Sequence, residues 1–353
     1  MKSDLLSLLR IDHPIIQAPM AGVSPPALAA AVSQAGALGS IAVGAGNAAQ
    51  AEAAIAEVRR LTDRPFQVNA FCHRSAHADP AREAAWLGWL APHFATHGAV
   101  PPTGLRTIYN SFLDDDAMLG VFLRTRPAVA SFHFGLPHPH QVKALKQAGI
   151  VLMASATSVG EARAVEAAGI DVVVAQGYEA GGHRGVFDTD APDPAIGTFS
   201  LVPLVARAVR IPVVAAGGIM DGAGIDAALR LGAAAAQMGT AFILCPESSA
   251  TQHHRDLMAQ GDALRTAVTD VISGRPARGL VNRLFSEVGA LGHPPLPDYP
   301  IAYDAAKALH AAAAAQGNQD YSVNWAGQGF PLARALPAAE LVRTLAKELA
   351  RTS

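Results

Sequence analysis

The chain has 353 residues, of which 50% are hydrophobic and 16% charged, and this balance supports a large buried core. A formal net charge of -2 gives no electrostatic case for nucleic acid or an anionic membrane, and no run of about 18 apolar residues suggests a membrane span. The two cysteines cannot form a disulfide framework and the N-terminal apolar patch is too short for a signal peptide, so we expect a cytoplasmic protein.

A recurring pattern fills residues 1–245: an apolar run, a glycine or polar stop, and a segment with helical spacing. Continuous runs of Val, Ile and Ala are typical of strands in a parallel sheet. The predicted strands are Ile15–Met20, Leu38–Gly44, Phe66–Phe71, Ala128–Phe134, Val151–Ala156, Asp171–Gln176, Ile211–Ala216 and Ala234–Gly239. The predicted helices between and after them are Pro25–Gln34, Ala48–Leu61, Pro80–His97, Phe112–Arg124, His140–Gln147, Val159–Ala168, Ser200–Val209 and Gly222–Leu231.

Eight strand–helix units are what a (β/α)8 TIM barrel needs, so we predict an α/β fold of this type. An open doubly wound sheet is the alternative. Such sheets usually have fewer strands, and no GxGxxG motif opens a helix after the first strand.

The pattern stops after residue 245. Residues 246–326 contain helical patterns at Ala250–Gln260 and Tyr303–Gln316, with a proline-rich link between them. We expect this segment to form a smaller, mostly helical second domain or lid. Residues 1–245 and 327–353 would form the barrel, with a final amphipathic helix at Leu336–Arg351 packed against it.

A TIM barrel carries its active site at the carboxyl ends of its strands. Carboxylates are nearly absent from these positions, so no metal site is expected. The amides of Asn69, Gln176 and Gln237 suit a planar ligand with mixed donors and acceptors. Gly217-Gly218 and Gly239-Thr240, after the last two strands, suit a phosphate, although glycines there could simply close turns. Together these residues indicate flavin mononucleotide (FMN).

A glycine-rich loop with one histidine, His183, follows the sixth predicted strand. Glycines let the backbone approach a ligand closely, and a histidine there is a titratable group. Taken by itself, the segment could equally be a surface loop. Glu179 in this loop is interpreted as a cap for loop N–H groups and not as a base.

These motifs give the chain a resemblance to the nitronate monooxygenase family, once called 2-nitropropane dioxygenase, in its class I form. The matching segments run nearly end to end: Pro14–Gly22, Ser131–Gly135, Gln176–Gly185, Ala215–Gly222, Gln237–Thr240, Pro297–Pro300, Tyr303-Asp304, Lys307–Leu309 and Trp325–Gly329. The resemblance implies an FMN enzyme that oxidises alkyl nitronates, including propionate 3-nitronate, with O₂ to a carbonyl compound and nitrite. It also suggests detoxification as a role and a monomer or homodimer as the assembly.

The resemblance assigns roles residue by residue. The FMN contacts would be Met20, Gly22, Asn69, Gln176, Gly181, Gly217, Gly218, Gln237, Met238, Gly239 and Thr240. His183 would be the catalytic residue, and the substrate-binding residues would be His133, Tyr109, Tyr299, Tyr303 and Lys307.

Physical chemistry leaves several of these roles open. His183 could take an α-proton from a neutral nitroalkane, or position and stabilise a nitronate that arrives as the anion. His133 could be a second anion contact or a core histidine. Lys307 lies one helical turn after Tyr303 and could attract an anion or be a solvated charge. The tyrosines could line a pocket or belong to an ordinary core.

Two other functions also stay open. One is an NADH-dependent flavin reductase, of quinones or of an enoyl thioester, on the same barrel. The other is a barrel that binds a phosphate ligand without redox chemistry.

Overall fold

The computed structural model describes residues 5–352 and contains a closed barrel of parallel strands. The strands are β1 (Ile15–Gln17), β2 (Gly39–Ala42), β3 (Phe66–Phe71), β4 (Val129–His133), β5 (Val151–Ala156), β6 (Val172–Gln176), β8 (Val213–Ala216) and β9 (Ala235–Met238). They pair in the order β1-β9-β8-β6-β5-β4-β3-β2. The ring closes where Ile16 bridges Leu38 in parallel, so that β1 meets β2. The predicted TIM barrel is therefore confirmed.

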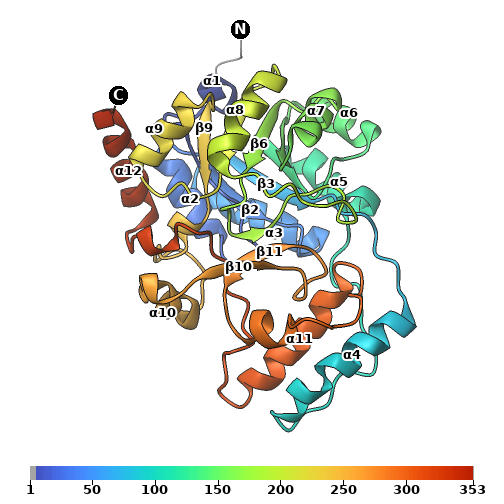
Figure 1. Ribbon diagram of the computed structural model, residues 1–353. Coiled ribbons are helices and arrows are strands. Elements are labelled where there is room, and N and C mark those ends of the chain that lie inside the picture. Colours follow the sequence, from blue (N-terminus) through green and yellow to red (C-terminus); the bar gives the residue numbers. More distant parts are fainter. Residues whose placement is uncertain (1–4, 353) are drawn as a thin grey trace.

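Helices surround the barrel, as Figure 1 shows, and their sequences fix where they begin. The barrel helices are α2 (Pro26–Gln34), α3 (Ala48–Leu61), α5 (Asp116–Thr125), α6 (Pro139–Gln147), α7 (Val159–Ala167), α8 (Thr198–Ala208), α9 (Gly222–Arg230) and α12 (Ala338–Thr352). Asn47 caps α3 by accepting from the N–H of Gln50 at 3.0 Å, and Asp221 caps α9 by accepting from the N–H of Gly224 at 2.8 Å. Such caps satisfy N–H groups that the first turn leaves without helical partners.

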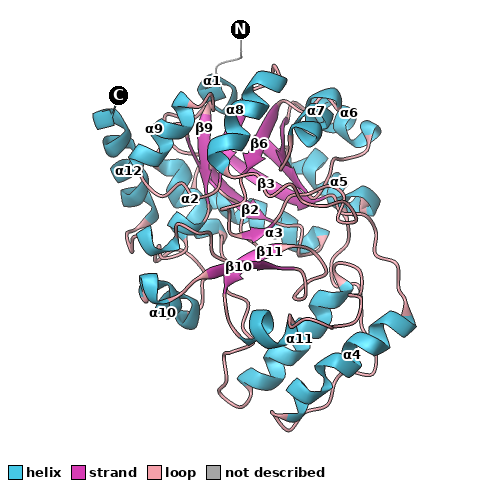
Figure 2. Cartoon of the chain, in the orientation of Figure 1, coloured by secondary structure: helices cyan, strands magenta, loops and turns pink. Residues whose placement is uncertain are grey.

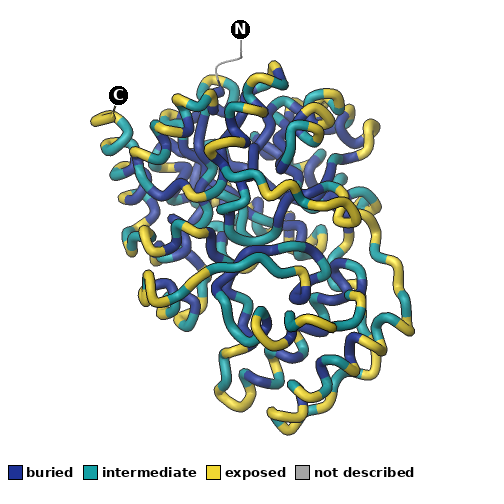
Figure 3. Tube along the Cα trace, in the orientation of Figure 1, coloured by how far each residue is buried: buried dark blue, intermediate teal, exposed yellow. Residues whose placement is uncertain are grey.

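Side chains alternate between the two faces of each strand, and this alternation separates two cores. Outward residues such as Val68 and Val173 belong to the large cluster that also holds Leu28 and Ile55 of the surrounding helices. Figure 3 shows the strands as the most deeply buried part of the chain. Parallel sheets covered on both faces require this arrangement.

The inward residues near the amino ends of the strands are apolar. Val129, Met153 and Val172 form a cluster with Leu5 and Leu9 of the short helix α1 (Leu5–Leu9). α1 therefore closes this end of the barrel. Toward the carboxyl ends the inward positions become polar, which places the polar groups at the opposite end.

A second lobe combines two segments that are far apart in the sequence. α4 (Pro80–Ala95) packs against α11 (Ile301–Ala314), below the barrel in Figure 1. Trp86 and Phe94 of α4 share a hydrophobic cluster with Leu284, Leu309 and Tyr321. The division at residues 246–326 stays a prediction, and we propose that α4 belongs with this second domain.

A short antiparallel sheet joins the lobe to the barrel, and the sequence analysis did not predict it. Its strands are β10 (Thr266–Thr269), β11 (Ala277–Leu280) and β7 (Gly182–His183), in the order β10-β11-β7 (Figure 2). These strands are too short to display a period of two. Ala277 pairs with His183, so the sheet fixes the loop that carries this histidine.

The remaining elements are short. They are α10 (Gln252–Ala259), a π-helix at Leu284–Val288, and 3-10 turns at Phe112–Asp114, Thr240–Phe242, Gly261–Ala263 and Phe330–Leu332. Within residues 5–352, none of the helices has the length and apolar character needed to cross a membrane.

Replacing Leu9 tests whether α1 closes the barrel. Leu9 is 1% exposed, so Leu9→Ala should lower the free energy of unfolding by about 2–5 kcal/mol in urea denaturation, through lost burial and a cavity. The control is Leu291→Ala, because Leu291 is 100% exposed and its truncation should change stability by no more than about 0.5 kcal/mol. Equal effects in the two variants would contradict the assignment.

Candidate active site

A cavity of about 530 Å³ lies at the carboxyl ends of the barrel strands. This volume falls in the usual range for small-molecule sites. The lining contains all of the predicted site residues: Met20, Gly22, Asn69, Tyr109, His133, Gln176, Gly181, His183, Gly217, Gly218, Gln237, Met238, Gly239, Thr240, Tyr299, Tyr303 and Lys307. The structure thus brings these residues together, while the role of each stays a prediction.

Amide side chains line one part of the cavity. The fully buried side chain of Gln67 has no hydrogen-bond partner at either its Oε1 or its Nε2, and Oε1 of Gln237 is also buried without a partner. The side chain of Asn69 differs, because its Nδ2 donates to Oγ of Ser131 at 2.9 Å. Unpaired buried amides are costly unless a ligand completes them, so this wall suits a planar molecule with donors and acceptors.

Gln67 was not among the predicted site residues, because only the last residues of this strand were expected to reach the site. Gln67 lies two residues before Asn69 and therefore on the same inward face. The period of two along the strand was the signal that could have identified it.

Two glycines after β8 give the cavity a wall of exposed backbone. Gly217 and Gly218 have φ angles of 115° and 74°, which residues with a side chain rarely adopt. Successive backbone N–H groups in such a turn can form an anion-binding concavity. This turn lines the same cavity as the amides.

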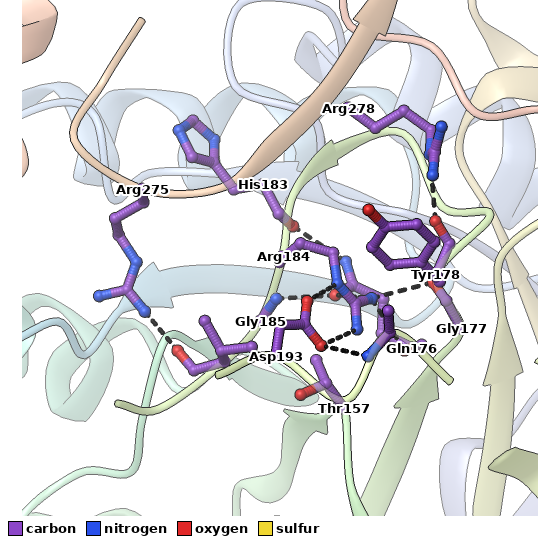
Figure 4. A network of polar contacts seen from close by, with 12 residues as sticks. Thr157, Gln176, Gly177, Tyr178, His183, Arg184, Gly185, Asp193, Arg275 and Arg278 are labelled. Carbon is purple, nitrogen blue, oxygen red and sulfur yellow. Dashed lines mark hydrogen bonds and ion pairs between the residues drawn. The ribbon is translucent and has the colours of Figure 1, made fainter. Parts of the chain in front are cut away.

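The loop that carries His183 is held by hydrogen bonds to the end of β6. Nε2 of Gln176 donates to the carbonyl of His183 at 3.0 Å, and Oε1 of Gln176 accepts from the N–H of Gly185 at 2.7 Å. Arg184 is fully buried, pairs with Asp193 at 2.7 Å and donates to the carbonyl of Gly177 at 3.0 Å (Figure 4). The amide of Gln176, expected to contact FMN, is thus engaged with the loop.

His133 and His183 are neighbours in the site, and their ring nitrogens have different hydrogen-bond partners. Nε2 of His133 donates to the carbonyl of His183 at 3.1 Å, and its Nδ1 lies 2.8 Å from Oγ of Ser155. Both ring nitrogens of His133 therefore have protein partners. Nε2 of His183 lies 2.8 Å from Oγ of Ser273, which itself donates to the carbonyl of Arg275 at 3.2 Å.

Both histidines are held in the neutral form. Each ring is partly accessible from the cavity, but desolvation by the surrounding protein lowers the pKa of His183 to about 3 and that of His133 to about 4. The ring of His133 lowers the pKa of His183 further, whereas the carbonyl of His183 raises the pKa of His133 by accepting its hydrogen bond. The positive charge of Arg275 lowers the pKa of both histidines. At neutral pH His183 is therefore an uncharged imidazole.

Three tyrosines and a lysine form the side of the cavity toward the second lobe. Nζ of Lys307 contacts the hydroxyl of Tyr109 and lies 4.7 Å and 5.0 Å from the ring centroids of Tyr109 and Tyr303. Burial raises the pKa of Tyr299 and of Tyr303, so both phenols stay protonated. This wall offers one cation and several hydroxyl groups.

Aromatic rings that sequence reasoning did not single out complete the pocket. The ring centroids of Trp325 and Phe134 lie 5.2 Å and 5.5 Å from that of His183. Both residues line the cavity. Phe134 stands inside a motif that the sequence analysis quoted, but nothing in its spacing indicated which way the ring points.

Glu179 does not compete with His183 as a base. Its carboxylate accepts from the backbone N–H of Thr198 at 2.8 Å and from Oγ1 of Thr198 at 2.9 Å. It therefore caps the first turn of α8, and not the N–H groups of its own loop as the sequence led us to expect. In the described part of the chain, no three His, Cys, Asp or Glu side chains are grouped to hold a metal ion.

The closed barrel and the cavity at its carboxyl end define a TIM-barrel enzyme. The chain matches the family model for nitronate monooxygenase over residues 2–348, and it belongs to this family of oxidoreductases. It is 61% identical over 342 residues to the nitronate monooxygenase of Pseudomonas aeruginosa, covering 97% of each chain.

Solved structures that are similar to this chain include a nitroalkane oxidase and FabK. Nitroalkane oxidase from Streptomyces ansochromogenes matches with a TM-score of 0.89 and 42% identity, covering 99% of this chain and 98% of that one. FabK from Thermotoga maritima matches with a TM-score of 0.73 and 30% identity, covering 100% of this chain and 97% of that one. The fold is thus shared with both of these proteins over nearly the whole chain.

The lowered histidine pKa values predict acid sensitivity. Below about pH 6.5 the unfolded chain protonates His133 and His183, whereas the folded chain takes up these protons only near pH 4 and pH 3. The free energy of unfolding should therefore fall as the pH drops from about 6.5 to about 4. The double variant with His133→Asn and His183→Asn should show a shallower fall in denaturant titrations.

The control for this prediction is His140→Asn. His140 is exposed on α6, so its replacement should leave the slope of stability against pH as in the parent chain. A double variant whose slope equals that of the control would refute the prediction.

Proposed function

We propose that this chain oxidises alkyl nitronates with O₂, using FMN, to a carbonyl compound and nitrite. The observation that carries the proposal is the cavity in which a neutral imidazole, a lysine and three phenols face amides and a glycine turn. The names of the similar proteins, a nitronate monooxygenase and a nitroalkane oxidase, support the same chemistry. A cytoplasmic location, a role in detoxification and a monomer or homodimer stay predictions.

The lining of the cavity fits FMN. The unpaired amide of Gln67 and the carbonyl oxygen of the Gln237 side chain could pair with the polar edge of a planar ring system. The turn at Gly217-Gly218 could hold the phosphate through backbone N–H groups. When bound, FMN would supply the redox chemistry, taking electrons from the substrate and passing them to O₂.

The opposite wall suits an anionic substrate. Lys307 supplies a positive charge, and Tyr109, Tyr299 and Tyr303 supply hydroxyl donors on rigid apolar rings. Phenols held in the protonated form can donate hydrogen bonds to nitro or carboxylate oxygens without adding negative charge. The aromatic rings also exclude water, which strengthens electrostatic contacts.

His183 has a suitable free atom for proton transfer. In the tautomer that carries its hydrogen on Nε2, His183 donates to Oγ of Ser273, whose own hydrogen is directed to the carbonyl of Arg275. This leaves the lone pair of Nδ1 to accept an α-proton from a neutral nitroalkane. A nitronate has no such proton to lose, so for this substrate His183 would only position the anion.

Anaerobic mixing tests the proposal. Purified protein should carry FMN or bind added FMN, and a nitronate should bleach the visible absorbance of the oxidised flavin while NADH does so slowly or not at all. Rapid bleaching by NADH without a response to nitronate would favour the flavin reductase. A colourless protein that gains no visible absorbance with added FMN would exclude both redox functions.

Replacing His183 separates its two roles. His183→Asn should lower kcat/KM for neutral nitroalkanes by about 10²–10⁴-fold, the usual loss when a general base is removed. Oxidation of the corresponding nitronate by the same variant is the internal control and should fall far less. Equal losses on the two substrates would mean that His183 does not act mainly as a base.

A further inference from the structure

Arg275 lies directly behind the aromatic wall of the cavity. Its side chain precedes β11, is 4% exposed, and stacks with its guanidinium carbon 4.4 Å from the centroid of the Phe134 ring. Phe134 lines the cavity, whereas Arg275 does not. Figure 4 shows Arg275 beside the loop that carries His183. A positive charge is therefore separated from the pocket by one ring.

The guanidinium of Arg275 is only partly satisfied by the protein. One guanidinium nitrogen, Nη2, donates to the carbonyl of Val186, and Nε is buried without a hydrogen-bond partner. Among residues 5–352, Arg275 forms no ion pair, in contrast to Arg184, which is paired with Asp193. Burying an unpaired cation is costly, so the arrangement calls for a compensating negative charge.

The carboxylates nearest to Arg275 accept hydrogen bonds from other residues. Glu161 and Asp188 are the acidic side chains that act on Arg275 from a distance. Glu161 accepts from Oγ1 of Thr157 and from the N–H of Phe187, both at 2.8 Å. Asp188 accepts from a backbone N–H in its own turn. Neither carboxylate closes on the guanidinium, whose charge therefore remains available to a bound anion.

The Phe134 ring connects Arg275 to the reacting side of the cavity. Its centroid lies 4.5 Å from that of His133, 5.3 Å from that of Tyr299 and 5.5 Å from that of His183. A substrate beside these rings would therefore lie across Phe134 from the guanidinium. Solvent and salt screen a buried charge less than an exposed one such as that of Lys307.

We propose that Arg275 is a specificity-determining residue that makes the site prefer anionic over neutral ligands, acting across the ring of Phe134 without touching the ligand. The inference rests on the proposed function only where it names the anion as a nitronate. A nitronate would supply the negative charge that Arg275 lacks. A neutral nitroalkane of the same shape has no net charge, so Arg275 would stabilise its binding much less.

The test measures how the protein as purified binds nitrate, an inert planar oxyanion, by titration calorimetry at constant ionic strength. Arg275→Gln removes the charge but keeps an N–H donor on a shorter side chain, and Arg275→Met removes both the charge and the donor. Arg275→Lys keeps the charge. Arg278→Gln is the matched control, because Arg278 is 2% exposed and stacks 4.9 Å from the ring centroid of Tyr178, which does not line the cavity.

We expect Arg275→Gln and Arg275→Met to weaken nitrate binding by about 10- to 100-fold, through loss of a Coulombic attraction across a water-poor wall. Arg275→Lys and Arg278→Gln should stay within about threefold of the parent chain. The KM for a nitronate should rise in parallel with the nitrate dissociation constant, while the KM for the neutral nitroalkane should not. Circular dichroism identifies any variant that does not fold. If one of the two charge-removing variants does not fold, the nitrate affinity of the other one tests the inference.

The inference would be overturned if nitrate affinity survived removal of the charge, or if Arg275→Lys or Arg278→Gln lost as much affinity as the charge-removing variants. A parent chain that does not bind nitrate overturns it as well. Nitrate binding that depends on Arg275 in a protein that oxidises no nitronate would support the inference and contradict the proposed function, so the two can fail separately.

Discussion

The closure of the parallel sheet is the constraint on which the rest of the structure depends. Once β1 bridges β2, every second side chain of each strand must face the axis of the barrel. Apolar residues and α1 fill the axis at the amino end. The polar inward residues are left at the carboxyl end, where a cavity forms between the barrel and α11 of the second lobe. The site is thus a consequence of barrel closure combined with the order of apolar and polar residues along each strand.

Hydrogen bonds from neighbouring side chains to its backbone hold the loop of His183 at that cavity. The carbonyl of His183 accepts from both Gln176 and His133, and β11 pairs with the strand that carries His183. Desolvation then keeps the imidazole neutral. Arg275 is buried in the same surroundings, where solvent screens its charge less than that of an exposed residue. The place of His183 and the electrostatic effect of Arg275 therefore both depend on the packing around Phe134.

Much of the barrel could be predicted because its signals are local. Apolar runs marked the strands, and the residues that follow each run marked the cavity lining. The second lobe could not be predicted in this way, since the contact between Trp86 of α4 and Leu309 of α11 joins segments more than two hundred residues apart in the printed sequence. The short strands β7, β10 and β11 carry no periodic signal, and their pairing depends on where the lobe is placed.

The sequence by itself determined the barrel, the family resemblance and the set of residues that gather at its carboxyl end, because strand periodicity and motif identity are properties of neighbouring residues. Only the tertiary structure decided which polar atoms are left free. It showed that the amide of Gln176 is engaged with the loop, that the amide of Gln67 is unpaired, and that Arg275 stands without a carboxylate. Partners and burial depend on residues that are distant in the chain, so no local pattern can encode them.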